Sequence, residues 1–536
     1  MRPLIGAAAA LLLAALTLGG CSKASNVRTG DATQVLHRSI GPDIEDLDPH
    51  MATLTANYSV LSALFEGLVA EDPVDLHPVP GVAERWDISP DGLTYTFYLR
   101  ADAKWSNGEP VTAQDFVDSW HRILTPSLGA TYASQLYILQ GAEAFNKAQA
   151  PFSEVGVKAA DPRTLMVRLE HPAPWFLSVL SGPDWFPVPI ALVKKYGGVA
   201  DRGNPWAGPG HWEGNGPFNL VSWHHNQEII VARSQTYWDE AKVRLKEIHF
   251  HSFDSIDAEE RAFRAEQVHL TETLPPDKVD SYRRDSPELL RMDPLLGTYF
   301  LRINVRKPGL NDARIRLALS LAIDRQAIVD KILRGGQKAA LTFTPSDFAG
   351  YEPGGALQPG AEKARQLLSD AGYAGGAGLP PFELLYNTSE NHKVIAESLQ
   401  EMWRRELGIR VTLVNEDVKS TEAARTAGTF DMLKSSLIAD YADPAAFLDT
   451  WRGDSSDNFT GWKNADYDSL LFTAARTTDP QARYALMARA EAILMGDSPV
   501  IPLYHYTHVF LARPSVHGWY PTLLDHHPYK GVWLQE

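Results

Sequence analysis

Stretches that alternate apolar and polar residues interleave with stretches of helical periodicity, and this order most limits the folds open to the chain. LTYTFYLR at 93–100 alternates as a half-buried strand does, and RTLMVRLE at 163–170 repeats the pattern. HKVIAESLQEMWRRELG at 392–408 has the spacing of an amphipathic helix that ends at Gly408, and a further alternating strand follows at 409–413. Interleaving without an internal repeat predicts an α/β fold with mixed sheets.

Capping residues mark where several of these helices should begin. Thr112 and Asp115 have the spacing of a capping box in front of a helical segment, DFVDSWHRIL. The segment 311–336 is expected to be helical, with Asn311 as its cap and a possible break at Asp324. These signals predict separate helices joined by short loops.

The N-terminal segment has the features of an export signal. A run of Ala and Leu about 13 residues long follows Arg2 and is too short to span a bilayer comfortably. LGGC at 18–21 resembles a bacterial lipobox, in which the Cys sulfur carries a diacylglycerol. Cys21 is the single Cys, so it cannot form an internal disulfide, and lipidation would remove an unpaired thiol. We expect a signal peptide over 1–20 and a polar, lipidated tether over 21–32; the alternative is an ordinary signal peptide beside a chance Cys.

Composition and motifs exclude several function classes. The net charge of −16, which becomes −17 once Arg2 is removed with the leader, argues against nucleic acid as a partner. No GxSxG, HExxH, P-loop or GxGxxG motif is present, so the sequence indicates no catalytic residues, no cofactor and no enzyme. His249 and His251 share a strand face, whereas His505 and His508 should point to opposite faces. We therefore expect no metal site.

One acidic residue lacks a local explanation. The stretch GTFDMLKSSLIADYAD at 428–443 contains an apolar run, 437–439, that ends at Asp440. Asp443 precedes a proline and is explained as the N-cap of a helix. Asp440 has no such role, and its neighbours alone favour a solvated loop residue.

Motifs along the whole chain after the leader agree, in order, with those of one protein family. They are LDPH (47–50), LFEGLV (64–69), PGVAERWDIS (80–89), LTYTFYLRADAKWSNGEPVTAQDFVDSW (93–120), NGPF (215–218), LLYNTSENH (384–392), AGTFDML (427–433), ADYADP (439–444) and IPLYHY (501–506). The chain thereby resembles the extracellular solute-binding proteins of family 5, the peptide-binding components of ABC importers.

The resemblance implies a two-lobed, periplasmic-binding-protein-like fold of type II, in the large three-domain cluster. Domain I would combine 33–69, 192–292 and 505–536, domain II would be an insertion over 70–191, and domain III would span 293–504. Two strands crossing near 293 and 504 would form the hinge about which the lobes close.

The resemblance also implies roles for particular residues. Asp440 matches the position that binds the α-ammonium of a peptide. Three positions near the peptide carboxylate match His392, Arg425 and Lys434. The cleft would be lined by Asn57, Tyr132, Val418, Leu437 and Ile438, where Asn57 stands in place of a Glu found in oligopeptide-binding members.

Other positions depart from those members. Lys434 replaces an Arg, which keeps the charge but loses the bidentate fork. Val418 and Leu437 replace Trp residues beside the ligand, which leaves ligand length and side-chain preference open. Ile438 and Gly297 replace a disulfide-bonded Cys pair, in agreement with the single Cys of this chain.

The expected function follows from the family. The protein would capture peptides, in particular short oligopeptides, between its lobes and deliver them to an ABC permease in the inner membrane. It would act as a monomer in the periplasm or at the cell surface, anchored by lipid on Cys21. The alternatives are a murein-derived or non-peptide ligand on the same fold, and a lipid-anchored hydrolase.

The lipobox interpretation makes a direct prediction. Cys21→Ser should leave the chain unprocessed or release it in soluble form, because no other residue can carry a thioether-linked lipid. Detergent phase partitioning of cell extracts measures this, with Ser22→Ala as the control that should stay in the detergent phase. Unchanged partitioning of Cys21→Ser would contradict lipidation.

Overall fold

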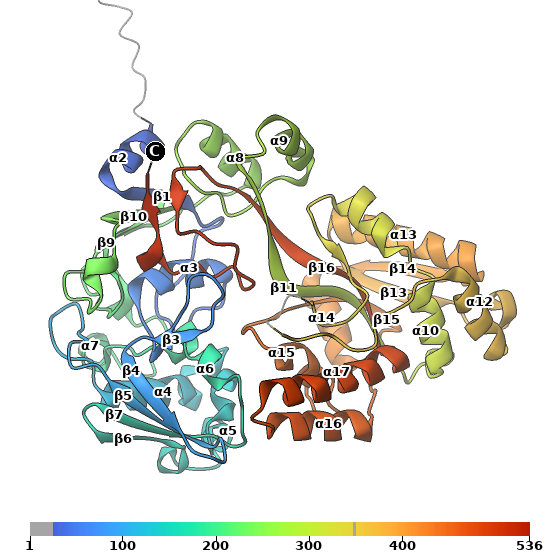
Figure 1. Cartoon of the computed structure of the whole chain (residues 1–536), viewed down its shortest axis with the longest axis horizontal. Coiled ribbons are helices and arrows are strands. Elements are labelled where there is room, and N and C mark those ends of the chain that lie inside the picture. The colour runs from blue at the N-terminus through green and yellow to red at the C-terminus, as the bar shows by residue number, and fades with distance from the viewer. Residues whose placement is uncertain (1–24, 347–349, 536) are drawn as a thin grey trace, which may run out of the picture.

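The protein consists of two lobes joined by two long strands. The structure is a computed structural model that describes residues 25–346 and 350–535. Figure 1 shows the lobes side by side, connected by β11 (Leu290–Ile303) and β16 (Val500–Leu511). The expected signal peptide over 1–20 and Cys21 lie outside the described residues. Among the residues described, no helix has the length and hydrophobicity that crossing a membrane requires.

The first lobe contains two sheets. One has the order β1-β10-β9-β8, in which β1 and β10 are parallel and the other neighbours antiparallel. The other is antiparallel, with the order β4-β5-β7-β6. Their strands are β1 (Val35–Ser39), β10 (Glu247–His251), β9 (Glu228–Arg233), β8 (Phe218–His224), β4 (Ala83–Ile88), β5 (Thr94–Leu99), β7 (Thr164–Arg168) and β6 (Val157–Asp161), beside the small pairs β2 (Val69–Glu71) with β3 (Pro78–Pro80) and β17 (Val516–His517) with β18 (Trp533–Leu534).

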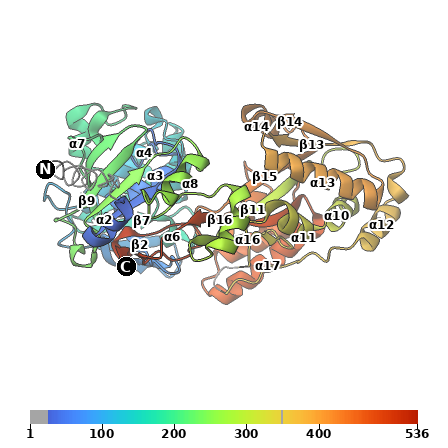
Figure 2. The ribbon, with the colours of Figure 1, turned by 90° about the horizontal axis from the view of Figure 1, so that it is seen from above.

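The helices of the first lobe pack beside these sheets (Figure 2). They are α2 (Asn26–Thr33), α3 (Thr55–Leu64), α4 (Ala113–Leu124), α5 (Ala142–Asn146), α6 (Phe176–Val179), α7 (Ile190–Tyr196), α8 (Ile256–Arg264) and α9 (Val279–Asp285). Short 3₁₀ turns η2 (Ala133–Ile138) and η4 (Pro183–Trp185) face the second lobe, where both contribute to the pocket described below. One continuous hydrophobic core runs through both sheets. The division of this lobe into domains I and II therefore stays a prediction.

The second lobe is built on a mixed sheet of order β12-β16-β11-β15-β13-β14. The strands not yet given are β12 (Lys338–Ala339), β13 (Phe382–Asn387), β14 (Val411–Glu416) and β15 (Met432–Ile438). Its helices are α10 (Ala313–Leu321), α11 (Arg325–Ala327), α12 (Ala361–Asp370), α13 (Glu390–Leu407), α14 (Val418–Ala427), α15 (Ala445–Leu448), α16 (Ala465–Ala475) and α17 (Pro480–Asp497). The α/β class with mixed sheets and the two-lobed arrangement are confirmed.

The two connecting strands form one antiparallel ladder that reaches from lobe to lobe. It runs from the Leu290–Leu511 pair to the Arg302–Val500 pair, and its register shifts between Pro294 and Thr298. Proline cannot donate to a ladder, so this shift is the natural point of bending. The domain limits expected at 293 and 504 fall inside these strands.

Residues 26–32, part of the expected tether, are helical. Asn26–Thr33 form helix α2, which Ser25 caps by accepting from the N–H of Arg28. Val27 is buried and donates its N–H to the carbonyl of Glu266, while Arg28 pairs with the Glu266 carboxylate at 3.0 Å. Polar composition suggested a flexible segment, but a good N-cap and one buried apolar residue are enough to dock this helix.

Two other capping predictions are correct, and one is wrong by one residue. The Asp115 carboxylate accepts from the N–H of Thr112 at 2.7 Å, as the capping-box spacing predicted. The helical segment 311–336 does break at Asp324, which caps α11. However, Asp312 rather than Asn311 caps α10, because its side chain accepts from the N–H of Arg314.

Asp443 does more than cap a helix. Its Oδ1 accepts from the N–H of Ala445 at 2.9 Å, as an N-terminal capping group does. It also forms a bidentate ion pair with Arg483 of α17, at 2.6 and 2.7 Å, in which both side chains are buried. This pair holds the loop after β15 against α17 and was missed because its partners lie forty residues apart.

We predict that Asp443→Asn destabilises the second lobe by about 3 kcal/mol, because it leaves the Arg483 charge buried without a counter-ion. Asn still caps a helix, so the loss would report the ion pair rather than the cap. Urea unfolding followed by circular dichroism measures the change. Asp454→Asn, which removes an exposed pair with Arg452, is the control and should cost less than about 1 kcal/mol. Equal effects of the two variants would contradict the assignment.

Candidate functional site

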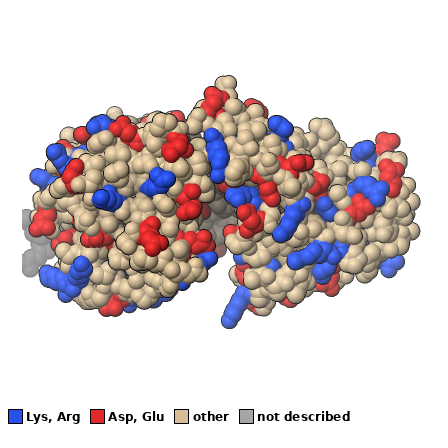
Figure 3. Space-filling model, turned by 90° about the horizontal axis from the view of Figure 1, so that it is seen from below, with Lys and Arg blue, Asp and Glu red and all other residues tan. Residues whose placement is uncertain are grey.

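A pocket lies where the two lobes meet. Its volume is about 230 Å³, and both lobes contribute to its lining. Tyr132, Gln135 and Asp184 come from the first lobe, while Ile438 and Asp440 come from the end of β15 in the second. Seen from below, the surface is hollowed into a groove between the lobes (Figure 3). The position between lobes that can move makes this pocket the candidate binding site.

Asp440 follows directly after β15 and faces the other lobe. Ala439 anchors the backbone before it by donating its N–H to the carbonyl of Leu296 at 2.8 Å. Gln135 Nε2 donates to Asp440 Oδ2 at 3.2 Å, which links the lobes through the predicted ammonium-binding residue. The rings of Trp175 and Tyr441 stack beside this contact with centroids 4.7 Å apart. Asp440 is therefore a residue of the interlobe pocket.

A second carboxylate shares the pocket with Asp440. Burial raises the pKa of Asp184 to about 7, and the charge of Asp440 adds to the effect. Burial also raises the pKa of Asp440, while the hydrogen bond from Gln135 opposes this shift. No Lys or Arg lines the pocket in the part of the chain that the structure describes. The basic side chain near Asp440 in this lining is His526, which opposes the rise of the Asp440 pKa. A cation that enters the pocket would add a partner for the two carboxylates.

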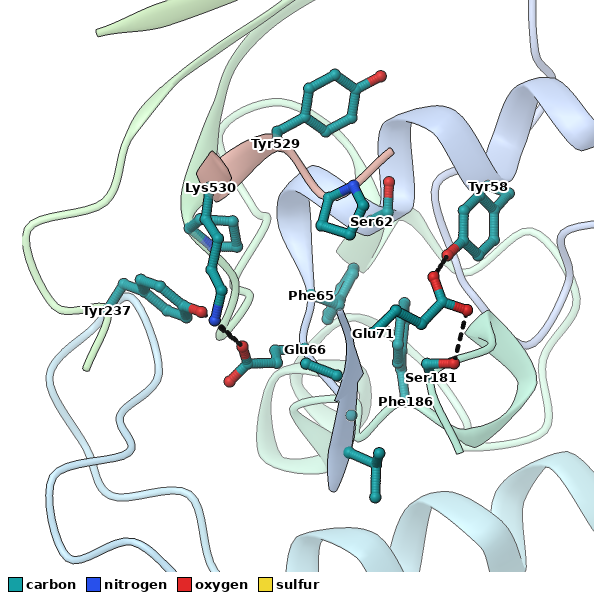
Figure 4. A pocket seen from close by; sticks show the side chains of 15 residues that line it. Tyr58, Ser62, Phe65, Glu66, Glu71, Ser181, Phe186, Tyr237, Tyr529 and Lys530 are labelled. Carbon is teal, nitrogen blue, oxygen red and sulfur yellow. Dashed lines mark hydrogen bonds and ion pairs between the residues drawn. The ribbon is translucent and has the colours of Figure 1, made fainter. Parts of the chain in front are cut away.

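A third carboxylate lies behind the pocket wall. Glu71 borders a small cavity of about 60 Å³, where it accepts from Tyr58 at 3.1 Å and from Ser181 at 3.0 Å (Figure 4). The ring of His526 lies 2.9 Å from the same carboxylate and also lines the interlobe pocket. Lys530 instead lies near Glu66, at 4.0 Å on the other side of the cavity. Glu71 thus has its partners, and it positions His526 in the pocket wall.

Basic side chains gather at the opposite end of β15. Lys434 lies with its Nζ 5.3 Å from the ring centre of Tyr299, and burial lowers its pKa to about 8. The ring of His392 lies 5.7 Å from that of Tyr299, and its pKa is lowered by burial and then by Lys434. Arg425 pairs with Glu422 of the same helix. His392 and Lys434 therefore lie in one cluster around Tyr299, and Arg425 lies on the adjacent helix α14. That these residues bind a peptide carboxylate stays a prediction.

The edge of β15 between these two ends is only partly paired. On one side β15 pairs with β11 along its length, from Met432–Ile303 to Ile438–Gly297. On the other side the pairs with β13 are Leu384–Met432 and Leu385–Leu433. Among the described residues, no strand pairs with the 434–438 stretch on that side, so its outward backbone groups are free to bind an extended chain.

Of the residues that were predicted to line the cleft, some line the interlobe pocket and others do not. Tyr132 and Ile438 are exposed and line the pocket. Leu437 lines an adjoining pocket, while Val418 is exposed at the start of α14 and borders neither pocket. Asn57 is buried, with its amide bonded to Leu54 N–H and the Asp46 carbonyl, so its neighbours rather than its side chain line the pocket.

Sequence reasoning missed Asp184, Gln135 and His526. Asp184 stands in a Pro-Asp turn, whose ordinary interpretation is local, and nothing along the chain indicates that Asp440 lies near it. His526 belongs to a His pair at 526–527, which by itself indicates neither a pocket nor the partners of the ring. These residues become visible only when the lobes are brought together.

Comparisons with known proteins agree with this architecture. Residues 77–459 match the family model of bacterial extracellular solute-binding proteins, family 5. The periplasmic oligopeptide-binding protein OppA of Escherichia coli K12 is 36% identical over 95% of this chain and 95% of its own length. The unliganded open form of the murein tripeptide binding protein MppA superposes with a TM-score of 0.82, at 35% identity over 94% of this chain and 97% of that one.

A further solved structure is OppA of Haemophilus influenzae in complex with RPPGFSPFR, with a TM-score of 0.75 and 31% identity, covering 94% of this chain and 99% of that one. The Escherichia coli OppA and the MppA relative are, by their names, periplasmic peptide-binding proteins. The family model covers well over half of the chain, and the identity extends from end to end. The chain therefore belongs to family 5 of the bacterial extracellular solute-binding proteins.

Proposed function

We propose that this protein is a lipid-anchored, extracytoplasmic receptor that captures short peptides between its lobes and delivers them to an ABC importer. The observation that carries the proposal is the arrangement along β15: carboxylates at one end, cations at the other, and a free strand edge between them. A peptide with free termini would place its ammonium group at the carboxylates and its own carboxylate at the cations.

The acidic end suits the ammonium terminus. Asp440 and Asp184 face a pocket whose described lining holds no Lys or Arg. The Asp440 side chain still reaches water in the present arrangement, although its surroundings already raise its pKa and Gln135 is its hydrogen-bond partner. Closure of the lobes would remove that water and make a cationic partner necessary. A peptide ammonium would supply it.

The free edge suits the peptide backbone. An extended ligand that adds a strand beside residues 434–438 would pair through main-chain groups, a mode that is indifferent to side chains. Lys434 and Asp440 are six residues apart, or roughly 20 Å at ~3.3 Å per residue. Subtracting ~3 Å for the polar contact at each end leaves roughly 14 Å, the length of about four extended residues. We propose tetrapeptides and their near neighbours as the preferred ligands.

Delivery and anchoring complete the proposal. The relatives named above are periplasmic, and a lipid on Cys21 would hold the receptor at a membrane surface close to its permease. Helix α2 begins at Asn26, so a short segment would separate the lipid from the folded body. The receptor would bind its ligand as a monomer, since both walls of the pocket come from one chain.

A murein-derived peptide is the second candidate ligand. The observation in its favour is the 35% identity to the murein peptide-binding protein MppA of Escherichia coli K12 over 95% of this chain, nearly equal to the 36% identity to OppA. Incubating the protein with a mixed peptide library that includes murein peptides, followed by mass spectrometry of what co-purifies, distinguishes the two. Intact linear peptides support the main proposal, while murein peptides alone support the second. Cleaved peptides would indicate a hydrolase, and an empty protein would indicate a non-peptide ligand.

We predict that Asp440→Asn weakens binding of free-amine peptides roughly 30- to 5,000-fold, because removing one partner of a desolvated charge pair costs on the order of 2–5 kcal/mol. N-acetylation of the peptide should weaken binding to the unmodified protein similarly. The two changes together should cost less than their sum, since they remove the same interaction. Isothermal titration calorimetry measures all four combinations.

Asp454→Asn is the matched control, because it removes an exposed carboxylate of the same lobe outside the pocket. It should bind free and acetylated peptides as the unmodified protein does. If acetylated and free peptides bind the unmodified protein equally, Asp440 is not the ammonium site.

The pKa of Asp184 makes peptide binding depend on pH. Its carboxyl titrates near pH 7 in the empty pocket, above its ordinary value of 3.8, and a peptide ammonium favours the ionised form. Affinity should therefore rise between pH 5 and pH 8, with proton release on binding, by up to about tenfold per pH unit. Calorimetry in buffers of different ionisation enthalpy detects the protons.

The same shift affects stability in the absence of ligand. A carboxyl whose folded pKa is raised destabilises the folded protein as pH rises from about 4 to about 7. Asp184→Asn should therefore raise the melting temperature at pH 8 but leave it nearly unchanged at pH 4. A variant with unaltered proton release and an unaltered melting profile would rule out Asp184 as the titrating group.

A further inference from the structure

Three histidines converge on one face of the first-lobe sheet. His37 of β1 lies directly opposite His249 of β10 in the parallel register, and His251 follows two residues later. Strand alternation puts all three imidazoles on the same face. The opposite face carries Leu36, Ile248 and Phe250, which are fully buried in the core. The histidines therefore do not result from core packing, and the sheet geometry itself brings them together.

The three rings approach closely enough to share a ligand. The centroid of His37 lies 4.6 Å from that of His249 and 5.3 Å from that of His251. His37 Nδ1 and His251 Nε2 are 3.0 Å apart, and one nitrogen from each residue lies within 4.8 Å of the other two. A tetrahedral zinc ion with Zn–N bonds of ~2.05 Å needs nitrogens about 3.3 Å apart, which small ring rotations would reach.

Two carboxylates, those of Glu228 and Glu247, lie beside the imidazole rings. Glu228 of β9 stands opposite His251, with its Oε2 3.5 Å from His249 Nδ1 and 3.9 Å from His251 Nδ1. Glu247 Oε2 lies 3.1 Å from His249 Nε2. In metal sites, ligating imidazoles characteristically donate their second N–H to a carboxylate, which fixes the tautomer and the ring orientation.

The charge state of the rings also fits a metal site. Burial and the neighbouring histidines lower the pKa of His37 to about 3, and burial lowers that of His251 to about 4. Both rings are thus neutral at the pH of the periplasm, which is the form that ligates metals. The side chains of His249 and His251 are each 18% exposed, so solvent reaches the cluster and leaves a route of entry.

We propose that His37, His249 and His251 form a binding site for a divalent transition-metal ion, with zinc as the best fit and water in the fourth position. Nitrogen ligands favour zinc, nickel and copper over magnesium and calcium. The sequence led to the opposite expectation because His37 is more than two hundred residues from its partners along the chain. Bound metal would tie β1 to β10, far from β15 and the interlobe pocket (Figure 1).

Zinc titration of the full chain, stripped with a chelator, tests the proposal by calorimetry. One equivalent should bind and raise the melting temperature. His249→Gln should weaken that binding by at least about 100-fold, and Glu228→Gln, which alters a supporting carboxylate, by about 10- to 100-fold. His225→Gln is the control, because this exposed histidine lies on the turn after β8, outside the cluster. The variant should bind zinc as tightly as the unmodified protein does.

Cobalt absorption of the unmodified protein gives a second readout that does not depend on any variant folding. Tetrahedral coordination should produce intense visible bands that zinc displaces. The absence of a bound equivalent, weak octahedral bands, or zinc binding that His249→Gln and His251→Gln leave intact would each overturn the proposal. The cluster would then be a set of neutral, mutually hydrogen-bonded rings.

Discussion

The antiparallel ladder between β11 and β16 is the interaction on which the rest of the molecule depends. One end, at Leu290 and Leu511, is packed into a small apolar cluster of the first lobe, and the other end lies in the core of the second. The ladder is the backbone connection between the lobes, and the Gln135–Asp440 hydrogen bond and the stacked rings of Trp175 and Tyr441 add contacts across the gap. The register of the ladder shifts between Pro294 and Thr298 and again between Tyr299 and Phe300, so the segment between the lobes is the least regular part of the ladder.

The site follows from the position of β15 in the second-lobe sheet. A central strand normally has partners on both sides, yet β13 pairs with β15 only at residues 432 and 433. The strand is therefore interior at its start and an edge at its end. The unpaired backbone groups of an exposed edge strand can hydrogen-bond to another chain, so proteins usually cover such edges. Here the edge runs from Lys434 toward Asp440, and its last residue, Ile438, lines the interlobe pocket. In the proposed function, a chain small enough to enter the space between the lobes would pair with it.

The sequence predicted what depends on neighbours along the chain and missed what depends on neighbours in space. Alternation at 93–100 and the Thr112–Asp115 capping signal correspond to a strand and a helix start in the structure, since both are decided within a few residues. The family resemblance supplied a candidate role for Asp440. Neither source revealed Asp184, the Asp443–Arg483 pair or the three histidines, because each depends on segments that only the tertiary fold brings together.

The contact between Gly297 and Ile438 shows how a local change can alter the pocket. The two residues are direct cross-strand neighbours, so relatives with cysteines at these positions could form a disulfide there. In this chain the Ile438 side chain lies over Gly297 in the space that a Cβ would otherwise fill. Ile438 is nevertheless 46% exposed and lines the pocket beside Asp440. Ile438 thus gives the pocket an apolar surface next to its acidic end. In the proposed binding mode the first side chain of a peptide would pack there, and burial would favour an apolar one.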